Sequence, residues 1–199
     1  MKAARIAAAL LLVWIAADFA FPVRHDLRQF DPHRVGQLET EMWRSYYDHR
    51  PVRLFRDLTT LLRRQFGLPF WRSCLGAWYA AHAAVVFQRG HERSDYERAL
   101  PDLVRYYALI RRASATQFDV DRVARLELEW WIVHRQRGSN LAQALADLQS
   151  AVYGAPAPAF AEHGRLRAEA MAIRDSGGDW GRIGALLDGS WVSLHRAVR

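Results

Sequence analysis

The chain of 199 residues contains a single cysteine, Cys74. One thiol cannot form an internal disulfide, and it cannot complete the cysteine pairs of zinc or haem-attachment motifs. Cys74 lies within residues 71–75 at the spacing of a core-facing helix. We therefore interpret it as a buried apolar thiol rather than as a nucleophile.

Lysine is almost absent: Lys2 is the only one, so 27 of the 28 basic residues are arginine. Together with the many alanines, this bias indicates a GC-rich bacterial genome more than phosphate recognition. The net charge of +7 would by itself suit a nucleic acid or an anionic membrane. However, the arginines are dispersed along polar faces and form no long basic block. We therefore do not expect nucleic acid as a partner.

The sequence also lacks the motifs that commonly identify an enzyme. It has no glycine-rich phosphate loop, no nucleophile elbow and no Ser/His/Asp order. No glutamate is followed three residues later by a histidine, and His-Glu-x-x-His is missing as well. These two absences remove the usual motifs of helical di-iron centres and of zinc peptidases. The sequence thus identifies neither a cofactor nor a reaction.

An apolar run over residues 6–17 follows the positive charges of Lys2 and Arg5. Its length fits a signal peptide better than the ~20 residues that span a bilayer. The cleavage site is poor, because Asp18 or Ile15 falls where a small residue is expected. An uncleaved anchor that contacts the membrane through residues 6–21, across Asp18, is therefore the alternative. Both interpretations place the rest of the chain in the periplasm or on the periplasmic side of the inner membrane. A third interpretation is the first core helix of a soluble protein.

The remainder of the chain has the period of helices, and no alternating β pattern bounded by turns occurs. We expect an all-α fold, a compact bundle of about seven or eight helices preceded by the N-terminal hydrophobic signal or anchor segment. The expected parts are a signal or anchor at 1–23, a polar linker at 24–33 and a single domain at 34–199. The expected helices cover 34–49, 51–66, 70–88, 94 to beyond 110, 120–137, a segment ending near 153, 156–173 and 179–198. The helix at 70–88 is expected to be the most buried, with a stripe that contains Trp71, Trp78 and Val85 on one side and alanines on the other.

Polar side chains interrupt the apolar faces of three expected helices. Glu127 and His134 share a stripe with valines and tryptophans over residues 120–134, Glu39 lies among Val35, Met42 and Tyr46, and His82 lies among aromatic and valine residues. An unpartnered polar group in such a place would cost about 2–7 kcal/mol, so each needs a partner. We expect His82, Glu127 and His134 to be largely buried, with the helix of His82 beside the helix at 120–137. His163 is a weaker fifth member of this set.

Two explanations of these residues stay open. In the first, they are structural: a buried Glu–His or Glu–Arg pair, or glutamates bonded by tryptophan and tyrosine donors. In the second, Glu39, His82, Glu127 and His134 form an acid/base or metal site. Glu127 and His134 are two turns apart and too distant to bind one ion together. We expect a domain that binds a protein or a small ligand, and an enzyme is the alternative.

Overall fold

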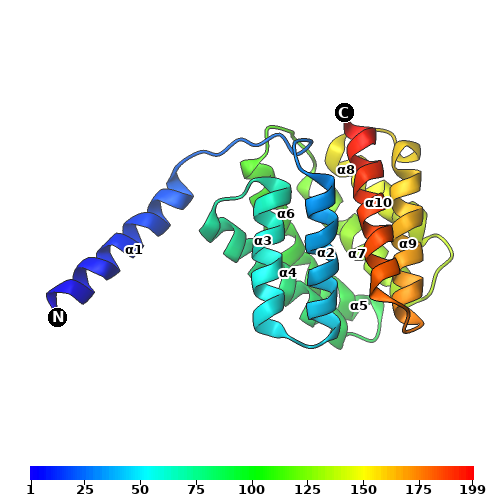
Figure 1. Cartoon of the computed structure of the whole chain (residues 1–199), viewed down its shortest axis with the longest axis horizontal. Helices are drawn as coiled ribbons and strands as arrows, with labels where there is room; N and C mark the ends of the chain where they lie inside the picture. The colour runs from blue at the N-terminus through cyan, green and yellow to red at the C-terminus, as the bar shows by residue number, and fades with distance from the viewer.

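The computed structural model describes residues 1–199 and contains helices but no strand. Its first helix, α1 (Lys2–Ala20), projects from one side of a helical body (Figure 1). None of the residues of α1 is buried, so α1 is not a core helix of that body. By length and composition, α1 is also the one helix that could cross a membrane, with a mean hydropathy of 1.8.

The body that follows α1 confirms the expected all-α bundle. It contains eight longer helices, α2–α4 and α6–α10, together with the single turn α5 and two short 3-10 helices. Their bounds are α2 Pro32–Tyr47, α3 Pro51–Phe66, α4 Phe70–Arg89, α5 Arg93–Tyr96, η1 Glu97–Ala99, α6 Leu100–Ala113, α7 Val120–Arg135, α8 Leu141–Tyr153, η2 Ala157–Phe160, α9 Ala161–Asp175 and α10 Trp180–Val198.

Local sequence signals account for most of these boundaries. The side chains of Asp31, Asp119 and Asp179 each accept a hydrogen bond from a backbone N–H in the first turn of α2, α7 and α10. Such bonds satisfy donors that a helix start leaves without an intrahelical partner. α3 and α8 end at Gly67 and Gly154, which adopt the left-handed conformation at φ of 63° and 73°.

The eight longer helices form a closed ring. α2 packs on α3, α3 on α4, α4 on α6, α6 on α7, α7 on α8, α8 on α9 and α9 on α10, and α10 packs back against α2. Figure 1 shows this last contact, where the C-terminal helix lies beside α2. Residues from nearly every helix of the ring contribute to one large apolar cluster. The centre of the ring is therefore formed by side chains that are far apart in the sequence.

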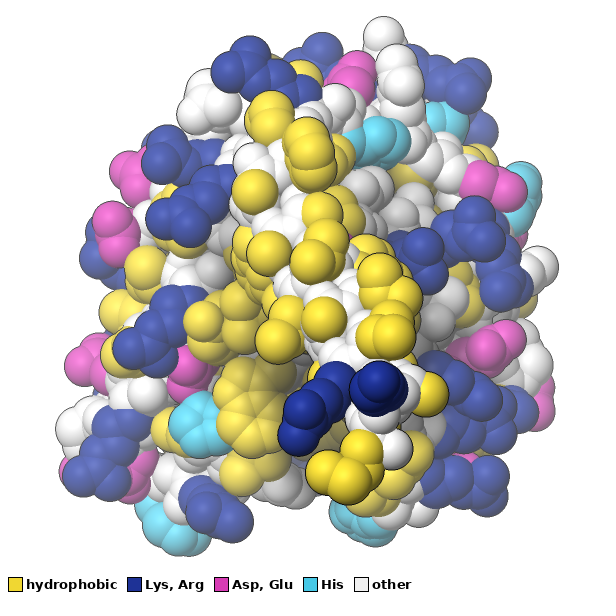
Figure 2. Space-filling model, turned by 90° about the vertical axis from the view of Figure 1, so that its left-hand side faces the viewer, with side chains coloured by type: hydrophobic (Ala, Val, Ile, Leu, Met, Phe, Trp, Pro, Cys, Tyr) yellow, Lys and Arg dark blue, Asp and Glu magenta, His cyan; other side chains and the backbone are white.

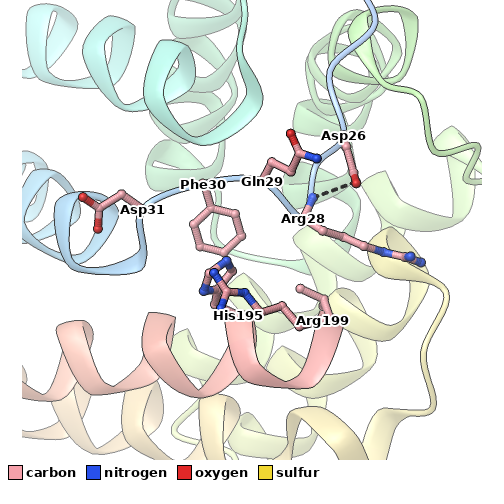
Figure 3. A pocket seen from close by; sticks show the side chains of 8 residues that line it. Asp26, Arg28, Gln29, Phe30, Asp31, His195 and Arg199 are labelled. Carbon is pink, nitrogen blue, oxygen red and sulfur yellow. Dashed lines mark hydrogen bonds between the residues drawn. The ribbon is translucent and has the colours of Figure 1, made fainter.

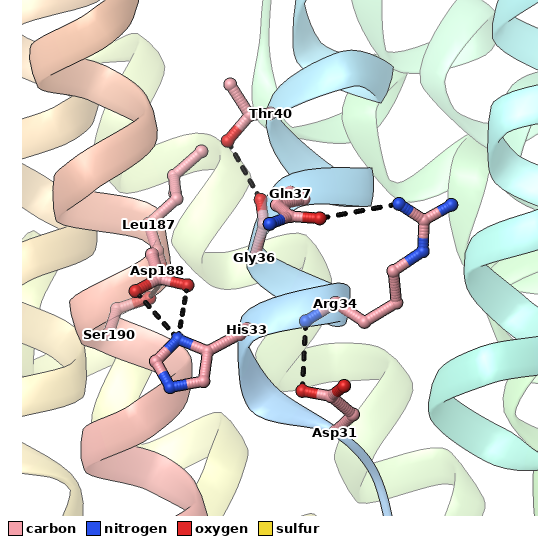
Figure 4. A network of polar contacts seen from close by, with 9 residues as sticks. All are labelled: Asp31, His33, Arg34, Gly36, Gln37, Thr40, Leu187, Asp188 and Ser190. Carbon is pink, nitrogen blue, oxygen red and sulfur yellow. Dashed lines mark hydrogen bonds and ion pairs between the residues drawn. The ribbon is translucent and has the colours of Figure 1, made fainter.

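Two glycines allow the closest helix contacts in the ring. A Cβ atom on Gly36 of α2 would lie 2.7 Å from the Cα of Asp188 in α10. Figure 4 shows the polar contacts around this crossing, including the 2.9 Å contact between His33 Nδ1 and the Asp188 carboxylate. A Cβ atom on Gly164 of α9 would lie 2.1 Å from the backbone oxygen of Ala142 in α8. Backbones this close leave no room for a side chain.

The segment at 24–33 is part of the body and not the free linker that its polarity suggests. Leu27 is fully buried and Phe30 is 8% exposed. The backbone of His25 also bonds to that of Ala113 and Ala115 at the end of α6. The segment between α1 and the ring is therefore fixed by buried side chains and by backbone bonds to the end of α6.

The packing of α4 differs from the sequence expectation. The stripe that was expected to face the core points outward: Trp78 is 59% exposed and Val85 is 41% exposed. The buried side is instead the one with small residues, including Ser73, Gly76 and Ala77. Small side chains let α3 and α6 approach closely, and Trp78 and Val85 remain on the surface while Val86 and Phe87 pack against the core.

Candidate functional site

Glu39 is sealed inside the ring by a cationic partner and an indole. Its carboxylate, 4% exposed, accepts a 2.7 Å bond from Arg167 of α9 and a 2.5 Å bond from the indole N–H of Trp191 in α10. The guanidinium of Arg167 also lies over the rings of Trp43 and Trp191, with its carbon 5.9 and 5.8 Å from their centroids. Glu39 is thus one half of a buried Glu–Arg pair, as the structural explanation describes.

His163 lies one turn before Arg167 on α9 and is fully buried. Its Nδ1 lies 2.9 Å from the backbone oxygen of Ser190, and its ring packs edge-on against Trp191. Burial, together with the charge of Arg167, lowers the pKa of His163 to about 3. His163 is therefore a neutral core residue at physiological pH.

Glu127 is bonded by two donors from aromatic residues. The Tyr107 hydroxyl donates to its Oε2 at 2.7 Å, and the indole N–H of Trp131 donates to its Oε1 at 2.9 Å. Burial raises the pKa of Glu127, although these donors and the charge of Arg167 act in the opposite direction. Its side chain nevertheless keeps some accessible surface, so it is not as buried as the sequence predicts.

Glu39 and Glu127 reach the same interior from α2 and α7. Burial and the charges of both carboxylates raise the pKa of Tyr106 in α6. The charge of Arg167 in turn acts on Glu127. The charges of Glu39, Glu127 and Arg167 therefore act across the interior, although Glu39 and Glu127 bond to different partners.

The two other predicted site residues lie on the outer surface. The side chain of His82 is 50% exposed and contacts Asp102 of α6 at 2.6 Å. The side chain of His134 is 25% exposed and contacts Asp175 of α9 at 3.0 Å. The prediction of a largely buried side chain is wrong for His82, because α4 turns its bulky stripe outward. His134 is half-buried, next to the end of α7.

The prediction that the helix of His82 lies beside α7 is also wrong for most of α4. α6 lies between α4 and α7 along the ring, and His82 pairs with α6. Only the C-terminal part of α4 reaches α7, where the rings of Phe87 and Trp131 lie 5.3 Å apart. His82 and His134 therefore do not join Glu39 and Glu127 in one site, and no group of three or more His, Cys, Asp or Glu side chains is arranged to hold a metal ion.

An open depression lies between the segment before α2 and the C-terminal end of α10 (Figure 3). It has a volume of about 650 Å³. The rings of Phe30 and His195 lie side by side there, 4.9 Å apart. Burial lowers the pKa of His195, and the charge of Arg199 acts in the same direction. The other lining residues are mostly charged: Asp26, Arg28, Gln29, Asp31, Val198 and Arg199.

Sequence reasoning missed the junction between α1 and α4. The carboxylate of Asp18, 3% exposed, accepts the backbone N–H groups of Trp71 and Arg72 at 2.9 and 3.3 Å. The Arg72 side chain bonds back to the main-chain oxygens of Asp18 and Phe21. α4 begins after Pro69 without a capping side chain of its own. The available signals were an acidic residue within an apolar run and a helix start without a cap.

No family model matches the chain, and a search of curated proteins and one of solved structures each find no significant match. The functional proposal below therefore depends on the geometry of this chain alone.

Proposed function

We propose that this chain is a membrane-anchored helical domain that faces the periplasm and binds a partner protein or a small ligand without catalysing a reaction. The observation that carries the proposal is α1, an apolar helix that projects from the ring and has the charges of Lys2 and Arg5 in its first turns. Positive charge ahead of an apolar segment is retained in the cytoplasm, so the ring would lie on the other side.

The contacts of Asp18 favour an anchor that is retained over a signal peptide that is removed. Cleavage after α1 would take away the carboxylate that caps α4, and it would leave Arg72 without its partners. Unsatisfied backbone donors at a helix start cost about 0.5–2 kcal/mol. A signal peptide that is removed would not need such contacts with the mature domain.

The arrangement of the polar residues favours binding over catalysis. Glu39 is occupied by Arg167 and Trp191, while His82 and His134 form separate surface pairs with aspartates. A small polar ligand could bind in the open depression of Figure 3, which is lined by Arg28 and Arg199 together with Asp26 and Asp31. Arg28→Ala should lower the affinity for such a ligand. Arg182→Ala, on another part of the surface, should leave that affinity unchanged.

The enzyme alternative is supported by one residue. Glu127 combines a raised pKa with some accessible surface, which is the combination expected of a general acid or base. In that alternative, Tyr107 and Trp131 would orient the carboxylate. Turnover abolished by Glu127→Gln in a protein that stays folded would support it against the binding proposal.

A reporter enzyme that is active only outside the cytoplasm, fused after Arg199, tests the proposed location. We expect an active reporter and a chain that stays in the membrane fraction after washing with alkaline carbonate. Replacing Ile6 and Leu10 by aspartate should release the chain from the membrane, whereas the same change at the exposed Ala172 and Ala185 should not. A soluble chain with an inactive reporter would overturn the proposal.

A further inference from the structure

We propose that the outward face of α4 rests on the anionic lipid surface of the bilayer that α1 spans. The ring would then contact the membrane surface directly and would not be connected to it by a flexible linker. We define the outward face by Trp71, Cys74, Trp78 and Val85. Successive members are three, four and seven residues apart, so they share one side of the helix. This inference rests on the membrane anchoring proposed above.

The junction with α1 fixes the depth of α4. Trp14 stacks on Phe70 at 5.4 Å and packs edge-on against Trp71 at 5.2 Å. Trp14 lies six residues before the end of α1, which is about 9 Å along a helix. The start of α4 is therefore held beside the last turns of the apolar helix. If α1 spans a bilayer, this start lies at the level of the lipid headgroups.

Asp18 makes this contact rigid. Its carboxylate bonds to the first turn of α4, and Arg72 returns bonds to the backbone at Asp18 and Phe21. The Asp18 and Arg72 side chains are only 3% and 10% exposed. Two helices joined by buried polar bonds and stacked rings cannot swing freely, so the ring keeps one orientation relative to α1.

The surface next to α1 has the composition of a membrane interface. Figure 2 looks at the side from which α1 projects and shows apolar side chains around it, with many Lys and Arg side chains nearby. Trp78 and Val85 are the exposed large apolar residues of α4, and tryptophan is enriched where proteins meet the headgroup region. Trp78 and Val85 continue the apolar surface of α1, and both remain exposed.

The charges at this surface are complementary to anionic lipid. Arg63 lies over the ring of Phe70 at one end of α4, and the exposed Arg89 lies at the other end. Asp102, an acid that contacts this face through His82 at 2.6 Å, forms an ion pair with Arg105 at 3.0 Å. Basic residues near an anionic lipid surface are attracted to it.

Spin labels in the full chain test this placement. In a Cys74→Ala background, a nitroxide is attached through Val85→Cys or, as a control on the opposite side of the ring, through Ala185→Cys. Each protein is placed in nanodiscs of phosphatidylcholine and phosphatidylglycerol, and collisions with oxygen and with a water-soluble nickel complex are measured. We expect the ratio of oxygen to nickel accessibility to be several-fold higher at position 85 than at position 185.

A second variant separates the junction from the anchor. Asp18→Ala should keep the chain in the nanodisc but lower the accessibility ratio at position 85 toward that at 185. Asp121→Ala, which removes an exposed acid at the start of α7, should leave the ratio unchanged. Equal ratios at 85 and 185 in the unmodified junction would overturn the inference while the anchoring proposal stands.

Three other outcomes would also decide the question. Protection of the label at position 85 from both reagents would indicate that protein covers α4, and this would overturn the lipid surface as its occupant. A chain that does not enter nanodiscs at all would overturn the anchoring proposal and this inference with it. Loss of the high ratio in discs of phosphatidylcholine alone would assign the contact to the anionic headgroups.

Discussion

Replacing Arg167 by methionine should strongly destabilise the ring, because it leaves the Glu39 carboxylate buried without its cation. Methionine keeps most of the apolar stem of Arg167 and removes the guanidinium, whose carbon lies over the rings of Trp43 and Trp191. What is lost is the 2.7 Å bond to a carboxylate that is 4% exposed. Breaking a buried ion pair in this way costs about 3–5 kcal/mol, a large part of the ~5–15 kcal/mol that stabilises a domain.

Removing both charges should cost much less than removing one. In Glu39→Leu/Arg167→Met no uncompensated charge remains, and the main polar loss is the indole N–H of Trp191. An unsatisfied donor of this kind costs about 1–3 kcal/mol. We therefore expect the double variant to be more stable than Arg167→Met alone by about 2 kcal/mol.

Urea unfolding of the full chain in a nonionic detergent, followed by circular dichroism, measures these differences. Arg165→Met is the matched control, because Arg165 lies on the same helix and pairs with Glu162 and Glu169 at the exposed surface. Such surface pairs contribute only about 0–1 kcal/mol. Equal losses for Arg165→Met and Arg167→Met, or a double variant no better than Arg167→Met, would refute the assignment of Glu39 as a structural residue.

Three further predictions follow from the interior. Glu127→Gln keeps shape and bonding capacity, so it should change the free energy of unfolding by no more than about 1–3 kcal/mol, and complete unfolding of this variant would contradict the described contacts. Gly164→Ala should destabilise the folded chain by about 1–3 kcal/mol, because the new Cβ would overlap the backbone of α8. Gly189→Ala should stabilise it by about 0.5–1 kcal/mol, because the nearest atom to the new Cβ is 3.5 Å away. Thermal melting of both variants measures the difference. The pKa of His163 falls from 6.5 to about 3 on folding, so the unfolded chain binds the extra proton between these values and stability decreases as the pH falls through this window. His163→Leu should reduce this decrease by about 1 kcal/mol per pH unit between about pH 6 and pH 4, and an unchanged slope would argue against the neutral core histidine.

The helices could be predicted from the sequence because their signals are local. Asp31, Asp119 and Asp179 begin helices, and Gly67 and Gly154 end them, through bonds and backbone angles within a few residues. The position of α1 was recognisable for the same reason, since its apolar run is continuous. These features do not depend on which segments of the chain become neighbours.

The partners of the candidate residues could not be predicted, because they come from distant segments. Glu39 and Arg167 are 128 positions apart, and nothing in either neighbourhood indicates the other. The orientation of α4 could not be predicted either. Apolar residues lie on all its sides, so the spacing of these residues does not indicate which side is buried. The close contact that Gly76 allows with Leu62 of α3 decides this, and Trp78 is left at the surface.

The mass of the chain extracted from the membranes of cells that produce it tests the central claim most directly. If α1 is a retained anchor that Asp18 joins to α4, the extracted protein includes the Lys2–Ala20 segment, and peptide mapping recovers the sequence across Asp18 and Phe21 intact. A protein that begins near residue 24 and is recovered from the soluble periplasmic fraction would contradict the claim.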